Sequence, residues 1–73
     1  MAKQHFDAIL LNPQKWEITE GRFVYLGNIY RDKKKRWTDG VDIRTSFVEK
    51  EFEVNGRKYI KTMNTIYKVG KVV

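Results

Sequence analysis

Short segments in which apolar and polar residues alternate run along the chain, separated by turn residues, a pattern typical of β-strands. The strongest turn signal is Asn55-Gly56, because a two-residue type I′ turn needs positive φ at both positions. A hairpin closed by this turn places an aromatic pair on one face and an opposite-charge pair on the other. The predicted opposed pairs are Phe52–Tyr59, Glu53–Lys58, Val54–Arg57 and Glu49–Thr62.

The same pattern extends on both sides of this hairpin. Residues 66–69 predict a third strand after a turn at 64–65, which makes a C-terminal meander. Upstream, residues 42–48 lead directly into the first hairpin strand and form an element too long to stay straight. We therefore expect a bend or bulge between residues 48 and 51.

A second hairpin is predicted from residues 16–19 and 22–25, joined by Glu20-Gly21. This loop pairs Ile18 with Phe23 and Trp16 with Tyr25, so that four large side chains share one face. Glutamate is a poor residue for positive φ, which leaves a longer loop as the alternative.

Residues 6–11 satisfy both helical spacing and a buried strand, and their short length between turn residues favours the strand. Asn12-Pro13 is expected to end this element. The sequence therefore predicts a mostly β protein: a small antiparallel half-open barrel or sheet built from hairpins and a C-terminal meander. We expect one domain over residues 1–73, with residues 1–5 mobile.

Composition agrees with a small globular domain, since 41% of the 73 residues are hydrophobic and ten are aromatic. The chain has no cysteine, which excludes disulfides and thiolate metal sites. Its longest apolar run, residues 8–11, is far shorter than the ~20 residues of a membrane span. We expect a cytoplasmic protein without cofactor or membrane contact.

Candidate catalytic groups are few. His5 is the only histidine, and it has no partner of the kind that a nucleophile–base pair or a zinc site requires. Glu49, Glu51 and Glu53 alternate along one strand, and their predicted neighbours favour a solvated outer face over an acid/base or metal cluster. Asp39-Gly40 is expected to be a turn, and the glycine spacing does not match a phosphate-binding loop. These patterns predict a protein that binds rather than catalyses.

The net charge of +6 favours association with anionic partners. The positive charge is most concentrated in residues 31–37, a basic run that is bounded by Tyr30 and Trp37. The candidate partner-binding residues are Tyr30, Arg31, Lys33, Lys34, Lys35, Arg36 and Trp37. Three interpretations are open: contact with an acidic protein surface, direct contact with single-stranded nucleic acid, or a solvated loop whose aromatic residues turn into the core.

One resemblance adds to this interpretation. The matching segments are Trp37-Thr38-Asp39-Gly40, Ile43-Arg44-Thr45-Ser46-Phe47-Val48, Asn55-Gly56, Thr62-Met63-Asn64-Thr65 and Tyr67-Lys68-Val69-Gly70. In this pattern, which covers about half of the chain, it resembles short β-proteins of tailed phages. In size and character it is similar to the RNA polymerase-binding transcription regulators of a Xanthomonas-infecting phage. The resemblance implies binding to host RNA polymerase, hindered σ-dependent initiation and read-through of terminators, and it assigns no contact residues.

Three functions therefore stay open. The first is a phage-type regulator that binds host RNA polymerase as a free monomer in the host cytoplasm. The second is a small single-stranded nucleic-acid-binding protein, and the third is an inhibitor of a host defence or nuclease complex.

Overall fold

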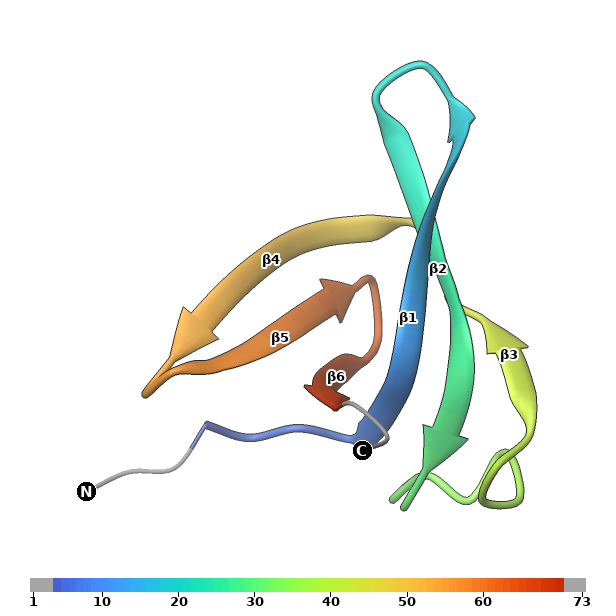
Figure 1. The fold of residues 1–73 in the computed structure, drawn as a ribbon, viewed down its shortest axis with the longest axis vertical. Coiled ribbons are helices and arrows are strands. Elements are labelled where there is room, and N and C mark those ends of the chain that lie inside the picture. Colours follow the sequence, from blue (N-terminus) through green and yellow to red (C-terminus); the bar gives the residue numbers. More distant parts are fainter. Residues whose placement is uncertain (1–3, 71–73) are drawn as a thin grey trace.

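Six strands and no helix make up the part of the chain that the computed structural model describes, residues 4–70 (Figure 1). The strands are β1 (Ala8–Thr19), β2 (Arg22–Tyr30), β3 (Asp42–Arg44), β4 (Val48–Val54), β5 (Arg57–Thr62) and β6 (Ile66–Gly70). This part of the chain therefore holds no helix long and apolar enough to cross a membrane. The expected mobility of residues 1–5 concerns mostly residues outside the described range.

The strands form one sheet in the order β3-β2-β1-β6-β5-β4. Two antiparallel meanders, β1-β2-β3 and β4-β5-β6, meet at a parallel pair in which residues 8–11 of β1 lie beside residues 67–70 of β6. The predicted β class and half-open architecture are confirmed. The sheet is mixed, because the β1–β6 pair is parallel while every other pair is antiparallel.

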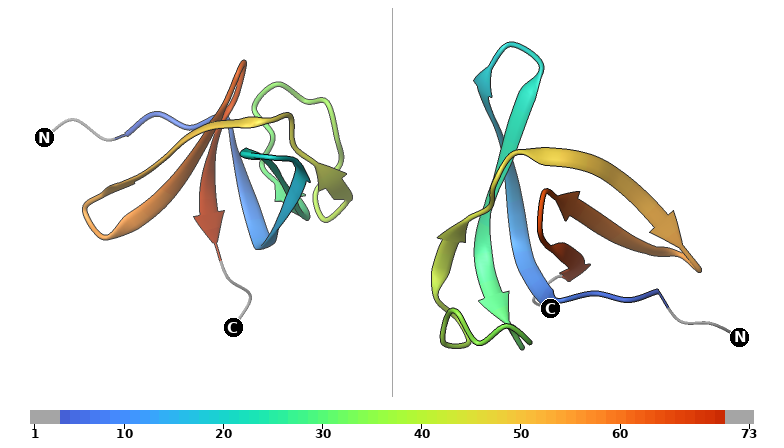
Figure 2. Two further views of the ribbon diagram at one scale, coloured as in Figure 1. Left: turned by 90° about the horizontal axis from the view of Figure 1, so that it is seen from above. Right: turned by 180° about the vertical axis from the view of Figure 1, so that it is seen from behind.

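Residues 45–47 alone connect β3 to β4, although these strands are at opposite edges of the sheet. So short a connection forces the sheet to curl until its edges approach each other. Seen from above, β5, β6, β1 and β2 fan out in order and β4 arches across them (Figure 2). The edges do not pair, so the sheet stays open on one side.

The core fills the concave side of this curled sheet. Its buried members are Ala8, Leu10, Ile29, Ile43, Ile60 and Tyr67. Gly27 permits a close approach between β2 and β1, because a Cβ at this position would lie 2.8 Å from the Leu11 carbonyl oxygen and 3.0 Å from Leu10 Cδ1. Sequence reasoning had no reason to single out this glycine.

The β4–β5 hairpin confirms the predicted turn and most of its register. Asn55 and Gly56 have φ of 52° and 77°, and the rings of Phe52 and Tyr59 stack with centroids 5.4 Å apart. The predicted Glu49–Thr62 pair is wrong, because β4 contains a bulge and Val48 takes that place opposite Thr62. This bulge confirms the expected irregularity between residues 48 and 51. The predicted continuous element from residue 42 is divided into β3 and β4.

Two expectations about the first hairpin are also wrong. Asn12-Pro13 does not end the first strand: Asn12 takes φ of 52° within a bulge, and β1 continues to Thr19. The turn at Glu20-Gly21 is present, and only its glycine has positive φ, 76°.

A second bulge at Ile18 shifts the register of this hairpin, so Glu17 lies opposite Phe23 and Lys15 opposite Tyr25. The predicted pairs of Ile18 with Phe23 and Trp16 with Tyr25 are therefore absent. Both displaced apolar side chains, Trp16 and Ile18, are exposed by 53% and 48%.

Thr45 fixes the connection between β3 and β4. Its backbone N–H donates to the Tyr25 carbonyl oxygen at 2.9 Å, and its hydroxyl oxygen accepts the Tyr25 N–H at 3.0 Å. The same hydroxyl donates to the Ser46 carbonyl oxygen at 2.8 Å. A buried threonine thus continues the hydrogen bonding to β2 at the point where the chain leaves β3 for the opposite edge.

Replacing Thr45 tests this role. Thr45→Val keeps the shape but leaves the Tyr25 N–H without its side-chain acceptor, so we expect the free energy of unfolding to fall by about 1–3 kcal/mol. Ser46→Ala, at an exposed neighbour, should change it by less than about 0.5 kcal/mol. Urea unfolding followed by circular dichroism measures both, and equal stability of the two variants would contradict the role given to Thr45.

Candidate functional site

The residues predicted to bind a partner lie in the connection between β2 and β3, which folds around the carboxylate of Asp32 (residues 31–37, the basic loop). The Asp32 side chain is only 1% exposed. It accepts the backbone N–H groups of Lys34 at 3.1 Å and Arg36 at 2.8 Å. It also accepts Nε and Nη2 of Arg36 at 3.2 and 3.3 Å. One buried acid therefore organises a run of cations.

The protonation of Asp32 follows from this geometry. Burial favours the neutral acid, but the hydrogen bonds from the Arg36 side chain and from the backbone of Arg36 and Lys34 outweigh it and lower the pKa of Asp32. For Arg36, burial works against the charged form, and the hydrogen bond to Asp32 raises its pKa. Both groups are charged at neutral pH, so the pair stays intact.

The basic loop is also tied to the body of the protein. The Lys33 N–H donates to the Asp7 carbonyl oxygen at 2.7 Å. Lys34 Nζ donates to the Asn64 carbonyl oxygen and to Thr65 Oγ1, which also accepts Arg36 Nη1 at 3.2 Å. These bonds join the loop to the segment before β1 and to the turn before β6.

A second set of bonds holds the far end of the connection. The Asp39 carboxylate accepts the Arg31 N–H at 2.7 Å, and the Gly40 N–H donates to the Ile29 carbonyl oxygen at 2.7 Å. Gly40 has φ of 90°, which confirms the predicted turn at Asp39-Gly40. The connection is thus bonded to the structure at both ends.

The predicted contact residues divide into two groups. The head groups of Lys34 and Arg36 are hydrogen-bonded within the protein, to Asn64, Thr65 and Asp32. All five cations are exposed, and none of Arg31, Lys33 and Lys35 forms an ion pair within residues 4–70. Tyr30 is half-buried at the end of β2. Trp37 is 38% exposed, and the Arg36 guanidinium lies 4.5 Å from its ring centroid. The interpretation in which both aromatic residues turn into the core therefore does not hold for Trp37.

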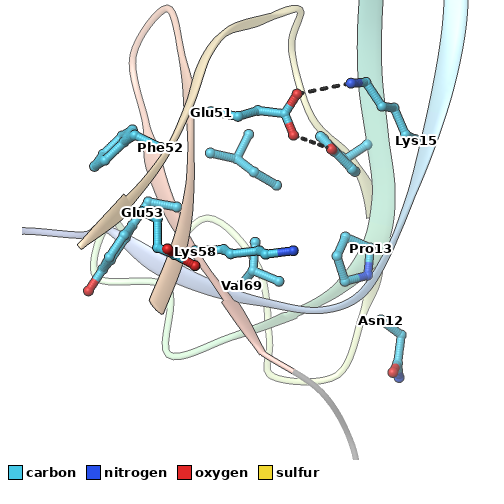
Figure 3. A pocket seen from close by; sticks show the side chains of 11 residues that line it. Asn12, Pro13, Lys15, Glu51, Phe52, Glu53, Lys58 and Val69 are labelled. Atoms are coloured by element: carbon cyan, nitrogen blue, oxygen red, sulfur yellow. Dashed lines mark hydrogen bonds and ion pairs between the residues drawn. The ribbon is translucent and has the colours of Figure 1, made fainter. Parts of the chain in front are cut away.

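A cleft of about 900 Å³ lies on the concave side, between the β1–β2 hairpin and the β4–β5 hairpin (Figure 3). Glu51 reaches across it from β4, accepting Tyr25 Oη–H at 2.5 Å and Lys15 Nζ at 3.0 Å. Glu51 is solvated as predicted, with 44% of its side chain exposed, but the predicted outer face is wrong, because Glu51 lies on the side that faces the cleft. Its cross-strand neighbour Ile60 belongs to the core, and this apolar partner was the available signal that the face turns inward.

The pKa values in the cleft reflect this bridge. The hydrogen bond from Tyr25 is the main cause that lowers the pKa of Glu51, with Lys15 adding to it. Burial, followed by the hydrogen bond to Glu51, raises the pKa of Tyr25 to about 12. The three groups therefore satisfy one another and hold the two hairpins together at the open side of the sheet.

Groups with catalytic chemistry are sparse in the described structure. Within residues 4–70, no three His, Asp or Glu side chains are close enough together to hold a metal ion. His5 is exposed and lies 3.0 Å from the Asp7 carboxylate. The basic loop is accordingly the candidate functional site.

Comparison with known proteins adds no constraint on this site, since no family model, curated protein or solved structure matches the chain.

The role of Asp32 predicts a particular pH dependence. Because its folded-state pKa lies below the ordinary value, the stability it contributes is present above that value and is lost as pH falls through the folded-state pKa. Asp32→Asn should lower the free energy of unfolding by about 1.5–3 kcal/mol at pH 7. This difference from the wild type should shrink as the pH is lowered from about 5 toward 2.

Urea unfolding at each pH measures the difference. Glu20→Gln, in the exposed β1–β2 turn, is the matched control and should follow the wild type throughout. A difference for Asp32→Asn that is independent of pH would contradict the role of its charge.

Proposed function

We propose that this protein is a phage-type transcription regulator that docks on host RNA polymerase through the basic loop. The observation that carries the proposal is the buried Asp32 carboxylate, which holds the loop in one shape. The resemblance to small phage β-proteins supports the choice of polymerase as the partner. In this proposal the protein acts in the host cytoplasm, is a monomer when free and needs no cofactor.

Because the loop is ordered before binding, the free-energy cost of docking through it is lower. Ordering a flexible loop and its side chains on binding costs free energy, about 0.5–1.5 kcal/mol for each immobilised long side chain. Here four backbone N–H groups in succession, those of residues 33–36, are already hydrogen-bonded. A partner therefore meets a surface whose backbone is already ordered.

The side chains presented by the loop suit an acidic protein surface. Trp37 and Arg36 form an exposed cation–π pair, and tryptophan and arginine are the residue types that most often anchor protein interfaces. Arg31, Lys33 and Lys35 of the same loop are exposed and add positive charge, which speeds association with an acidic partner. A regulator that docks in this way needs no catalytic group to hinder initiation or to promote terminator read-through, the two effects that the resemblance implies.

Capture of polymerase tests the proposal. Tagged protein should recover RNA polymerase subunits from a bacterial lysate and bind the purified enzyme. Trp37→Ala should weaken binding about 30-fold, the effect of losing an anchor worth ~2 kcal/mol. Arg31→Asn with Lys35→Asn should also weaken it, and asparagine suits their positive φ of 52° and 55°.

The control is the double variant Arg44→Gln with Lys58→Gln, which removes the same charge from β3 and β5 and should bind like the wild type. Recovery of no polymerase subunits would overturn the proposal. Recovery of a host nuclease or defence complex in their place would assign the loop to inhibition of that complex.

A further inference from the structure

A second basic surface lies on the convex face of β4, β5 and β6, away from the core. Neighbouring residues across a sheet point to the same face, and faces alternate along each strand. Ile60 pairs with Tyr67, and both are in the core. The adjacent row, Tyr59 with Lys68, therefore lies on the opposite face, where Tyr59 is itself buried, at 5% exposure, and Lys68 is half-buried.

The outward rows carry a strong excess of positive charge. On this face Tyr59 of β5 lies opposite Phe52 of β4. Two further cross-strand neighbours on the same face are Lys61 opposite Lys50 and Arg57 opposite Val54. Lys33 joins this face because its Nζ lies 4.2 Å from the centroid of the same Phe6 ring that Lys68 covers. We define the convex basic face by its cations: Lys33, Lys50, Arg57, Lys61 and Lys68.

Acidic side chains are almost confined to the other side of these strands. The inward row of β4 carries Glu51 and Glu53. On the outward side, Glu49 at the bulge pairs with Lys61 at 3.0 Å. Among residues 4–70, no ion pair engages Lys33, Lys50 or Lys68. Their charges are therefore available to an anionic ligand.

Aromatic rings lie beneath these lysines. Lys33 and Lys68 both lie over the Phe6 ring, at 4.2 and 5.4 Å from its centroid, and Lys50 lies 5.5 Å from the centroid of Phe52. Cation–π contacts of this kind attract the ammonium groups to the rings without neutralising their charge. Phe6 and Phe52 are half-buried, and lysines cover their rings, so a ring face becomes free only when a ligand draws a lysine away from it.

We propose that the convex basic face binds single-stranded nucleic acid. Lysines neutralise phosphates, and a lysine that moves from its ring to a phosphate leaves that ring face free to stack on a base that a duplex would keep covered. A protein partner fits this face less well, because protein interfaces are depleted in lysine and built on exposed apolar anchors. The exposed large apolar residues of the described chain all lie outside β4, β5 and β6: Trp16, Ile18, Trp37, Val41, Phe47 and Met63.

This site is distinct from the polymerase-docking surface proposed above and does not depend on it. Only Lys33 belongs to both, so the two surfaces can be separated by mutation. A regulator with both would contact polymerase through the basic loop and a nucleic-acid strand through the convex basic face.

The test is a fluorescence-anisotropy titration of the full chain with labelled 20-nucleotide dT and U oligomers over a series of salt concentrations. The wild type should bind with a Kd of about 1–100 µM at physiological salt and more tightly at low salt. Lys50→Gln with Lys68→Gln should weaken binding at least about tenfold and reduce the slope of log Kd against log salt by about 1.4, since each lost phosphate contact contributes ~0.7.

Two controls keep the outcome specific. Arg44→Gln with Lys58→Gln removes the same net charge elsewhere and should change Kd less than about threefold. Arg31→Asn with Lys35→Asn should keep oligonucleotide binding even where it abolishes polymerase capture. Circular dichroism checks the fold of each variant, and Lys50→Gln with Arg57→Gln replaces the first pair if Lys68→Gln disturbs Phe6.

Three results would overturn the proposal. The first is no binding at low salt, and the second is equal weakening by the convex-face and control pairs. The third is equal affinity for the oligomers, a 20-base-pair duplex and polyphosphate of matched charge, which would show attraction by net charge alone.

Discussion

The short connection at residues 45–47 is the constraint on which the architecture depends. It joins strands at opposite edges of one sheet, so the sheet cannot be flat. Thr45 holds the crossing by bonding both backbone polar groups of Tyr25, and Glu51 bridges the open side to Tyr25 and Lys15. The resulting curl encloses a small core on one side and presents a convex basic face on the other.

The basic loop also depends on one polar side chain, the buried carboxylate of Asp32. A run of five cations repels itself, and a solvated loop would be a poor docking element. Burying one carboxylate among them both compensates the charge and supplies acceptors for the backbone N–H groups of the loop. The cations that remain exposed then project from an ordered backbone, which is the property that a docking surface needs.

Local signals predicted local structure well. Asn55-Gly56 specified its turn and the Phe52–Tyr59 stack, because the positive φ values that the turn requires suit these two residue types and do not depend on distant contacts. Bulges were harder, since one extra residue at Ile18 changes every pair beyond it. Non-local features had no local signal: the parallel β1–β6 pair joins residues almost sixty positions apart, and it places the segment before β1 next to the basic loop.

In the candidate site too, some features had a local sequence signal and others depended on the fold. Charge and aromatic content were enough to select residues 31–37, but Asp32 looked like a lone acid in a basic run, and its organising role depends on burial that the fold creates. Glu51 was misplaced for a similar reason, because the side of β4 that faces the core is decided by packing against β1 and β2. The convex basic face became recognisable only when the register had separated the charges of β4 and β5 onto two sides.

The central claim is that the basic loop is ordered before its partner arrives and is the surface that the partner covers. Amide hydrogen exchange, followed on the protein alone and with RNA polymerase added, tests it most directly. The account predicts slow exchange at residues 33–36 in the free protein, because each of these N–H groups is hydrogen-bonded, and further slowing when polymerase is present. Exchange at the rate of an unstructured chain in the free protein, or rates unchanged by polymerase, would contradict it.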